Sequence, residues 1–173
     1  DEITNIMSTE KELKIFLPYF KATINENSKS EEIEEKLEIG ENDSYISHLI
    51  RNDLLDEFIV YVNQTNYELS NQINESIYET NLFLLENKST LIEYAAFFGS
   101  IQIIQYLKLN DIKLNPSLWL YAIHSDNPEI INFLEENHIV PTDKLLEKCI
   151  KESIKCHHNN IAYYINDKIT NKK

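Results

Sequence analysis

Hydrophobic residues in the second half of the chain recur at helical spacing, and the whole pattern returns 27 residues later. Within residues 90–115 the apolar side chains stand three and four positions apart, as they do along one face of a helix. The recurring pairs are Tyr94 and Tyr121, Ala95 and Ala122, Ile103 and Ile130, Ile104 and Ile131, Tyr106 and Phe133, Leu107 and Leu134, Asn110 and Asn137, and Ile112 and Ile139. A fixed period of this size predicts stacked pairs of helices.

Local signals divide each copy, at about residues 90–115 and 117–142, into two helices. Thr90 and Glu93 form a capping box, which predicts the start of a helix that ends at Gly99-Ser100. Asn115 followed by Pro116, and Asn127 followed by Pro128, predict the starts of the two helices in the next copy. Proline suits the first helical position because the N–H that it lacks would have no partner there.

A degenerate copy is expected earlier, at about residues 45–65. Its first helix should begin at Tyr45, and Asp53 is expected to cap its second helix. Val62 then takes a core position of the later copies. Residues 64–89 are expected to connect this copy to the next, with one helix at their short apolar run.

A third full copy is expected at about residues 145–170. Cys149 takes the small-residue place that Ala122 has in the preceding copy. About four extra residues fall between the two expected helices, at 153–158. Apolar residues that include Tyr164 are expected to close this last layer.

Residues 1–44 predict a separate, acidic N-terminal helical region, so that the repeat domain spans residues 45–173. A capping box at 9–12 opens one helix, which Pro18 should kink or end. A second helix is expected from near Ser28 or Ser30 to Gly40, because glycine is the preferred residue just after a helix. Its acidic face is expected to be solvated, and the alternative is that this face binds a basic partner.

The charge of the chain excludes two classes of partner. The chain has 16 lysines and arginines and 29 acidic residues, which gives a formal charge of −13. Arg51 is the single arginine. Binding to nucleic acid or to an anionic membrane surface needs a basic stripe, and the sequence has none. We therefore expect a protein partner, with a basic or an apolar contact surface.

Neither a membrane span nor a secretory signal is visible in the sequence, since no apolar run approaches the ~20 residues that cross a bilayer. The two cysteines, Cys149 and Cys156, are seven positions apart, which on a helix is about 10 Å and too far for a disulfide. A reduced, cytoplasmic setting is expected, with the nucleus as the alternative.

Few residues carry chemistry in a recognisable pattern. With two glycines, the chain cannot build a glycine-rich phosphate loop. The cluster Cys156-His157-His158 has ligand chemistry, but neighbouring helical residues point about 100° apart and cannot meet at one ion without help from elsewhere. His48, His124 and His138 are expected to be surface or capping residues. The sequence therefore predicts no catalytic residue, no metal site and no cofactor.

The repeat itself resembles a known motif. Residues 90–115 resemble an ankyrin repeat, and the residues that fill its structural positions are Thr90, Ile92, Ala95, Ala96, Gly99, Ile101, Ile103, Ile104 and Leu107. Residues 117–142 are similar in a looser way, with Trp119 expected to be buried in the core. The 27-residue period is shorter than the usual 33-residue ankyrin period. There is no room for a full β-hairpin finger between Asn115 and Ser117.

The chain from about residue 45 to 170 resembles a divergent ankyrin-like family of unknown function that is abundant in protist ankyrin proteins. The resemblance implies an all-α, ankyrin-like solenoid of stacked helix pairs, with shortened or absent fingers. It also implies a non-catalytic module that binds another protein, with further ankyrin repeats possible on its C-terminal side. The alternatives are a structural cap for a longer array and, third, an unrecognised enzyme or metal-binding domain.

The resemblance also implies where a partner would bind. In ankyrin-like helices the two residues after the paired alanines face the concave side. The contact residues expected on this basis, together with residues near the ends of the second helices, are Phe97, Phe98, Asn110, His124, Ser125 and Asn137. Exposed phenylalanines would form a hot spot. The alternative is that one or both phenylalanines pack on residues 64–89 or on Ile50.

Overall fold

The computed structural model describes residues 30–170, which are mostly helical and contain no β-strand. The predicted capping box at 9–12 and the break at Pro18 lie outside the described residues. Internal contacts divide the chain into two units, each described by itself here. Unit 1 contains the chain up to His48 together with Gln72–Ser89, and unit 2 contains Leu49–Asn71 and the chain from Thr90 onward. Among residues 30–170, no helix is both long enough and apolar enough to cross a bilayer.

In unit 1, helix α3 (Ser30–Ile39) ends at Gly40, as predicted. Gly40 has a positive φ of 67°, and its carbonyl accepts hydrogen bonds from the backbone and the hydroxyl of Thr80, at 3.0 and 2.8 Å. A side chain at Gly40 would clash with that hydroxyl, since a Cβ would lie 2.6 Å from it. Residues 72–89 thus fold back on the end of α3.

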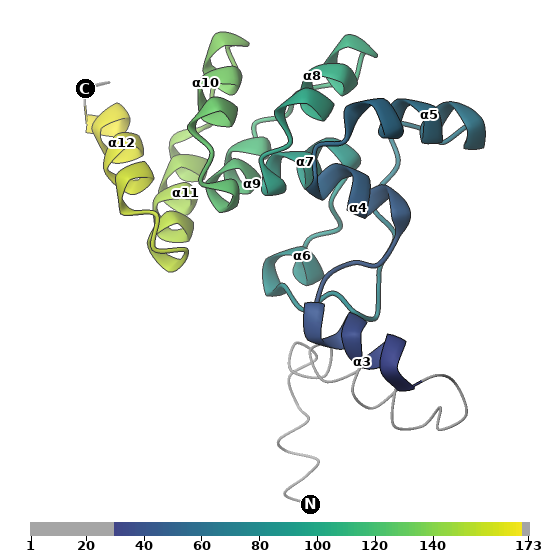
Figure 1. Cartoon of the computed structure of the whole chain (residues 1–173). Coiled ribbons are helices and arrows are strands. Elements are labelled where there is room, and N and C mark those ends of the chain that lie inside the picture. The colour runs from purple at the N-terminus through teal and green to yellow at the C-terminus, as the bar shows by residue number, and fades with distance from the viewer. Residues whose placement is uncertain (1–29, 171–173) are drawn as a thin grey trace, which may run out of the picture. The chain divides into compact units, whose positions relative to one another are not determined.

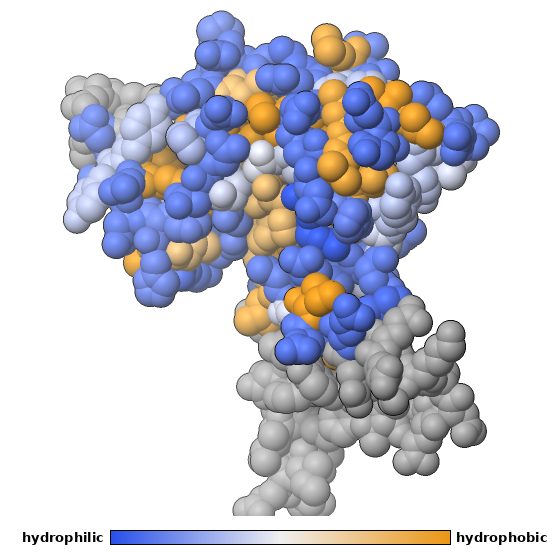
Figure 2. Space-filling model, viewed as in Figure 1, coloured by the Kyte–Doolittle hydropathy of each residue, from blue (hydrophilic) through white to orange (hydrophobic). Residues whose placement is uncertain are grey.

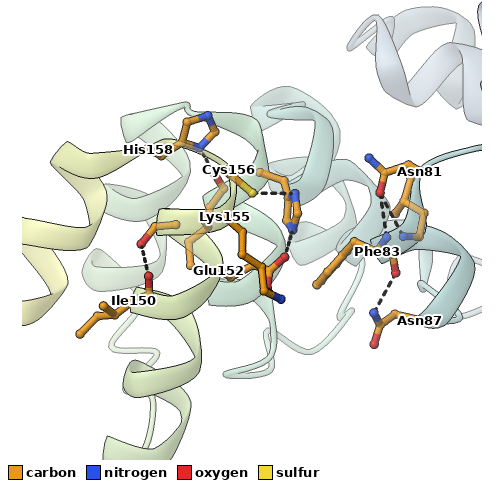
Figure 3. A network of polar contacts seen from close by, with 12 residues as sticks. Asn81, Phe83, Asn87, Ile150, Glu152, Lys155, Cys156 and His158 are labelled. Carbon is orange, nitrogen blue, oxygen red and sulfur yellow. Dashed lines mark hydrogen bonds and ion pairs between the residues drawn. The ribbon is translucent and has the colours of Figure 1, made fainter.

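The helix predicted within residues 64–89 is α6 (Leu82–Glu86), which also belongs to unit 1. Asn81 caps it, because its side-chain oxygen accepts the N–H groups of Phe83 and Leu84 at 3.0 and 3.3 Å (Figure 3). Asn87 closes the other end by donating its side-chain amide to the Phe83 carbonyl at 2.8 Å. Asparagine therefore satisfies both ends of this short helix.

Unit 2 is built from helix pairs (Figure 1). Their bounds are α4 (Tyr45–Arg51) with α5 (Leu55–Thr65), α7 (Leu91–Phe98) with α8 (Ile101–Leu109), α9 (Leu118–Ser125) with α10 (Pro128–Glu136), and α11 (Asp143–Lys155) with α12 (Asn159–Thr170). Helix α4 begins in unit 1 and ends in unit 2. From α7 onward each helix packs on its partner, while α7, α9 and α11 pack on one another in that order. Helix α5 packs on α8.

The helices of unit 2 end in a repeated way. A residue with positive φ follows α4, α7, α9 and α11, and these residues are Asp53, Gly99, Asp126 and His157. After α7, the backbone N–H of Ser100 donates to the carbonyl of Ala95, five residues earlier, at 2.9 Å. The equivalent bonds join Leu54 to Leu49 after α4, at 3.0 Å, and His158 to Ser153 after α11, at 2.8 Å. This left-handed turn satisfies the last carbonyls of a helix.

The second helices of the pairs share their own ending. Positive φ angles follow α5, α8 and α10 at Asn66, Asp111 and His138. Here the equivalent backbone bonds join Tyr67 to Val62, Ile112 to Leu107 and Ile139 to Leu134, at 2.9, 3.1 and 2.9 Å. The geometry supports the alignment of the degenerate first copy with the later two, because Val62, Leu107 and Leu134 accept the same bond.

The recurring apolar residues form the core of unit 2, as the pattern predicted. The pairs with both members buried are Tyr94 and Tyr121, Ala95 and Ala122, Ile103 and Ile130, Ile104 and Ile131, and Leu107 and Leu134. Cys149 is buried in the place of the alanines. The buried Trp119 donates its indole N–H to the Ile139 carbonyl at 2.9 Å, which removes the cost of an unpaired polar group.

Asp53 does not cap α5, contrary to the prediction. The residue before α5 is Leu54, which makes no side-chain cap. The Asp53 carboxylate instead accepts the N–H groups of Gln102 and Ile103 at 3.1 and 3.0 Å, at the start of α8. Because Asp53 has a φ of 48° at the end of α4, its side chain meets the adjacent layer instead of the helix that follows.

Asn115 is not the cap of α9, which begins at Leu118. The intervening residues form a tight turn in which the Leu118 N–H bonds to the Asn115 carbonyl at 3.0 Å. Ser117, just before the helix, donates its hydroxyl to Glu93 of the preceding layer at 2.9 Å. By contrast, the capping box of Thr90 and Glu93 is present as predicted.

The last layer differs from its prediction in two respects. The extra residues belong to α11, which extends to Lys155. They do not lengthen the loop that follows this helix, contrary to the prediction from the sequence. Tyr164 is 41% exposed, so it does not close the core. Its hydroxyl donates to the Glu135 carboxylate at 2.6 Å, on the preceding α10. Ala162 and Ile165 of α12 are buried.

Candidate functional site

The six residues expected to contact a partner lie at three kinds of position in unit 2. Phe97 and Phe98 end α7, while His124 and Ser125 end α9 in the next layer. Asn110 and Asn137 follow α8 and α10, the second helices of the same two layers. The structure therefore places the six as matched pairs on neighbouring layers.

Phe97, one of the expected contact residues, is buried, so the reading in which it forms part of an exposed hot spot is wrong. It is 7% exposed, and its ring stacks on the imidazole of His124 with centroids 4.6 Å apart. The packing of α7 on α9 explains this, because it brings the last turns of the two helices together. Phe98 is half-buried, and the Arg51 guanidinium lies 6.0 Å from its ring centroid. Phe98 thus keeps part of its ring at the surface.

Ser125, Asn110 and Asn137 all close helices. The Ser125 hydroxyl donates to the Ala122 carbonyl at 2.8 Å. The side-chain amides of Asn110 and Asn137 donate to the carbonyls four residues earlier, at 2.8 and 2.7 Å. Lys108 donates to the side-chain oxygen of Asn137. These capping roles leave Asn110 exposed and Ser125 and Asn137 half-buried.

His124 is also the centre of a cluster that the sequence did not predict. Its Nδ1 lies 3.4 Å from Cys156 Sγ, and its Nε2 lies 3.4 Å from Glu152 Oε1. The dashed lines from Cys156 and Glu152 in Figure 3 run to this same imidazole. Glu152 and Cys156 stand one turn apart at the end of α11, whereas His124 ends α9. The sequence predicted a surface or capping role for His124 and did not predict these contacts.

A signal in the sequence could have found this cluster. The 27-residue period, with the four extra residues of the last copy, places the end of α11 in register with the end of α9. His124 then falls beside Glu152 and Cys156, because matched helices of adjacent layers pack together. The sequence reading considered only the consecutive residues Cys156, His157 and His158. In the structure His157 is exposed, and His158 donates its Nδ1–H to the Ile123 carbonyl at 2.7 Å.

The surroundings favour the neutral forms of the imidazole and the thiol. Burial lowers the pKa of His124, and nearby His158 and Lys155 lower it further, while Glu152 opposes them. Burial raises the pKa of Cys156, Glu152 raises it further, and Lys155 opposes. In the neutral tautomer with its proton on Nε2, the Nδ1 of His124 would accept the Cys156 S–H, at 3.4 Å. Glu152 lies on the other side of the same ring, 3.4 Å from Nε2.

This arrangement has the order of a nucleophile, a base and a carboxylate, but its electrostatics do not favour a cysteine nucleophile. An activated cysteine needs a lowered pKa, whereas the pKa of Cys156 is raised. Burial raises the pKa of the second cysteine, Cys149, to about 12, and that side chain is fully buried. Cys156 therefore lacks the electrostatic activation that acyl transfer by a cysteine requires.

Comparison with known proteins shows no relative. No protein-family model matches the sequence, and no curated protein or solved structure matches it either. The case for a function therefore depends on the residues and their geometry.

Proposed function

We propose that this chain is a non-catalytic module that binds another protein, built from divergent ankyrin-like helix pairs. The observation that supports the proposal concerns α7 and α9, the first helices of two neighbouring pairs. These helices end at equivalent positions of the repeat. Phe98 of α7 and Ser125 of α9 are 27 positions apart and both half-buried. Repeat proteins present partner contacts as equivalent positions on successive layers.

The ankyrin-like character of the proposal rests on the sequence motif of residues 90–115 and on the order of helix packing in unit 2. Residues 110–117, where a finger would lie between layers, contain turns and no strand. This agrees with a period shorter than that of ordinary ankyrin repeats. The proposed contact face is the one that carries Phe98 and Ser125, whereas Asn110 and Asn137 follow the second helices, at the other end of each pair.

The partner is proposed to carry a basic surface with an apolar side chain that meets Phe98. The chain has a formal charge of −13, so a basic partner is attracted at long range. Polar residues cover most of the coloured surface in Figure 2, with hydrophobic residues between them. The Phe98 ring packs against the rings of Tyr94 and Phe97, with centroids 4.7 and 4.9 Å away. A partly exposed aromatic ring held in this way can serve as a binding hot spot.

The test is quantitative capture of partners from the source cells by three versions of the chain. The change Phe98→Ala should weaken partner recovery by about tenfold or more, because truncating a hot-spot aromatic costs at least about 2 kcal/mol. Phe97→Ala is unsuitable, since Phe97 is buried and its loss would disturb folding. Tyr163→Ala serves as the control, because Tyr163 is an aromatic residue of α12 that is 75% exposed.

Equal recovery by Phe98→Ala and the unchanged chain would overturn the proposal. Loss of partners with Tyr163→Ala alone would favour a second candidate, a cap or stacking block for further repeats. The exposure of Tyr163 and Tyr164 on α12 supports that candidate, since a further layer could cover them.

A further inference from the structure

Three side chains that commonly bind transition metals converge in unit 2, from two helices. His124 ends α9, and Glu152 and Cys156 end α11. One ligand atom from each, a ring nitrogen, a carboxylate oxygen and a thiol sulfur, can be chosen so that all lie within 4.8 Å of one another. Imidazole, carboxylate and thiolate are together typical ligands of zinc.

The distance between the cysteine sulfur and the nearer ring nitrogen agrees with a tetrahedral site. Bonds of about 2.3 Å to sulfur and about 2.0 Å to nitrogen place tetrahedral ligand atoms about 3.5 Å apart. Cys156 Sγ and His124 Nδ1 are separated by 3.4 Å. Glu152 and Cys156 are four residues apart on α11, so their side chains project from the same side of the helix.

One side chain must turn, because a single ion takes only one ring nitrogen of His124. Glu152 Oε1 now faces Nε2, at 3.4 Å, while the thiol faces Nδ1. Glutamate has three side-chain torsions and cysteine has one, so the carboxylate is the group that turns toward Nδ1. Lys155 pairs with the other oxygen of Glu152 at 2.8 Å, and its side chain is 70% exposed.

The surroundings hold the ring and limit access of water. The Phe97 ring stacks on His124 with an interplanar angle of 23°, which fixes the plane of the imidazole. The side chains of His124 and Glu152 are 11% and 16% exposed. An ion could therefore reach the site from solvent and would be largely enclosed once it is bound.

We propose that His124, Glu152 and Cys156 bind one Zn²⁺ ion, with a water molecule in the fourth position. On binding, the thiol releases its proton to solvent, and the sulfur, the carboxylate and Nδ1 form bonds to the ion. The thiolate and the carboxylate together neutralise its charge. The ion would join α9 to α11 and so tie two layers together. This inference does not depend on the proposed protein-binding function.

The test is titration of the untagged chain with Zn²⁺ alone, in competition with a chromophoric chelator. We expect one ion per chain and a higher melting temperature with zinc. Cys156→Ser and Glu152→Gln should each weaken binding by more than about 100-fold, because each removes a direct ligand. The matched control is His157→Ala, which removes an exposed histidine beside Cys156 and should leave the affinity unchanged.

Substitution with Co²⁺ gives a second readout, since a sulfur-to-cobalt charge-transfer band should appear with the unchanged chain and be absent from Cys156→Ser. Circular dichroism in EDTA establishes that each variant is folded, and Glu152→Gln keeps the size of the side chain if Cys156→Ser does not fold. Three results would overturn the proposal. The first is stoichiometric zinc binding by Cys156→Ser, the second is an equal loss of binding in His157→Ala, and the third is no zinc binding by the unchanged chain.

Discussion

Gly99 and Asp126 meet the same backbone requirement with different residues. Each follows the first helix of its pair, with a φ of 77° and 49°, and His157 follows the third with 62°. Glycine enters this region freely, whereas other residues pay a steric cost that aspartate and asparagine bear best. The sequence predicted the turn at Gly99 because glycine signals it. The sequence has no such signal at His157. The prediction therefore placed the extra residues of the last copy, at 153–158, in a loop.

Replacing Gly99 with alanine should lower the free energy of unfolding by about 1–2 kcal/mol, the cost of a left-handed residue with a side chain. An added Cβ would lie 3.4 Å from Asn127 Cβ, so the cost comes from the backbone angle and not from a clash. Urea denaturation followed by circular dichroism measures the effect. The reverse change, Asp126→Gly, should stay within about 1 kcal/mol of the unchanged chain. A Gly99→Ala chain as stable as the original would contradict this reading.

Helices in unit 2 are capped partly by their own sequence and partly by the next layer. The local caps, Thr90 with Glu93 and Asn127 before Pro128, were predictable because each partner lies within three residues. The start of α8 has no cap from its own Ser100, and Asp53 of the adjacent pair supplies it. Such a bond between residues about 50 apart follows from packing, so no local pattern reveals it.

Removing this cap should destabilise the fold. Asp53→Ala leaves the N–H groups of Gln102 and Ile103 without their acceptor, so we expect a loss of about 0.5–2 kcal/mol. Asp53→Asn keeps one acceptor oxygen and should lose less. Asp56→Ala, at an exposed position of α5, should change stability by no more than about 0.5 kcal/mol. Thermal and urea unfolding measure all three, and equal losses for Asp53→Ala and Asp56→Ala would refute the capping role.

At the scale of the whole molecule, the sequence predicted the helix pairs better than it predicted the chemistry they bring together. Buried positions such as Leu107 and Leu134 were found because hydrophobic spacing is a local property that repeats. The cluster of His124, Glu152 and Cys156 needs the register between α9 and α11, which the longer α11 obscures. The sequence left the exposure of Phe97 open, because its burial depends on that same neighbouring layer.

The most direct test of the stacked-pair account compares Leu107→Ala and Leu134→Ala by equilibrium unfolding in urea. The two leucines are 27 positions apart, and they are 0% and 1% exposed. Each change should lower the free energy of unfolding by about 2–5 kcal/mol, because each leaves a cavity between layers. Leu109→Ala, two residues along α8 and 82% exposed, should change it by less than about 0.5 kcal/mol. A near-neutral Leu134→Ala beside a costly Leu107→Ala, or an equal cost for Leu109→Ala, would contradict the account.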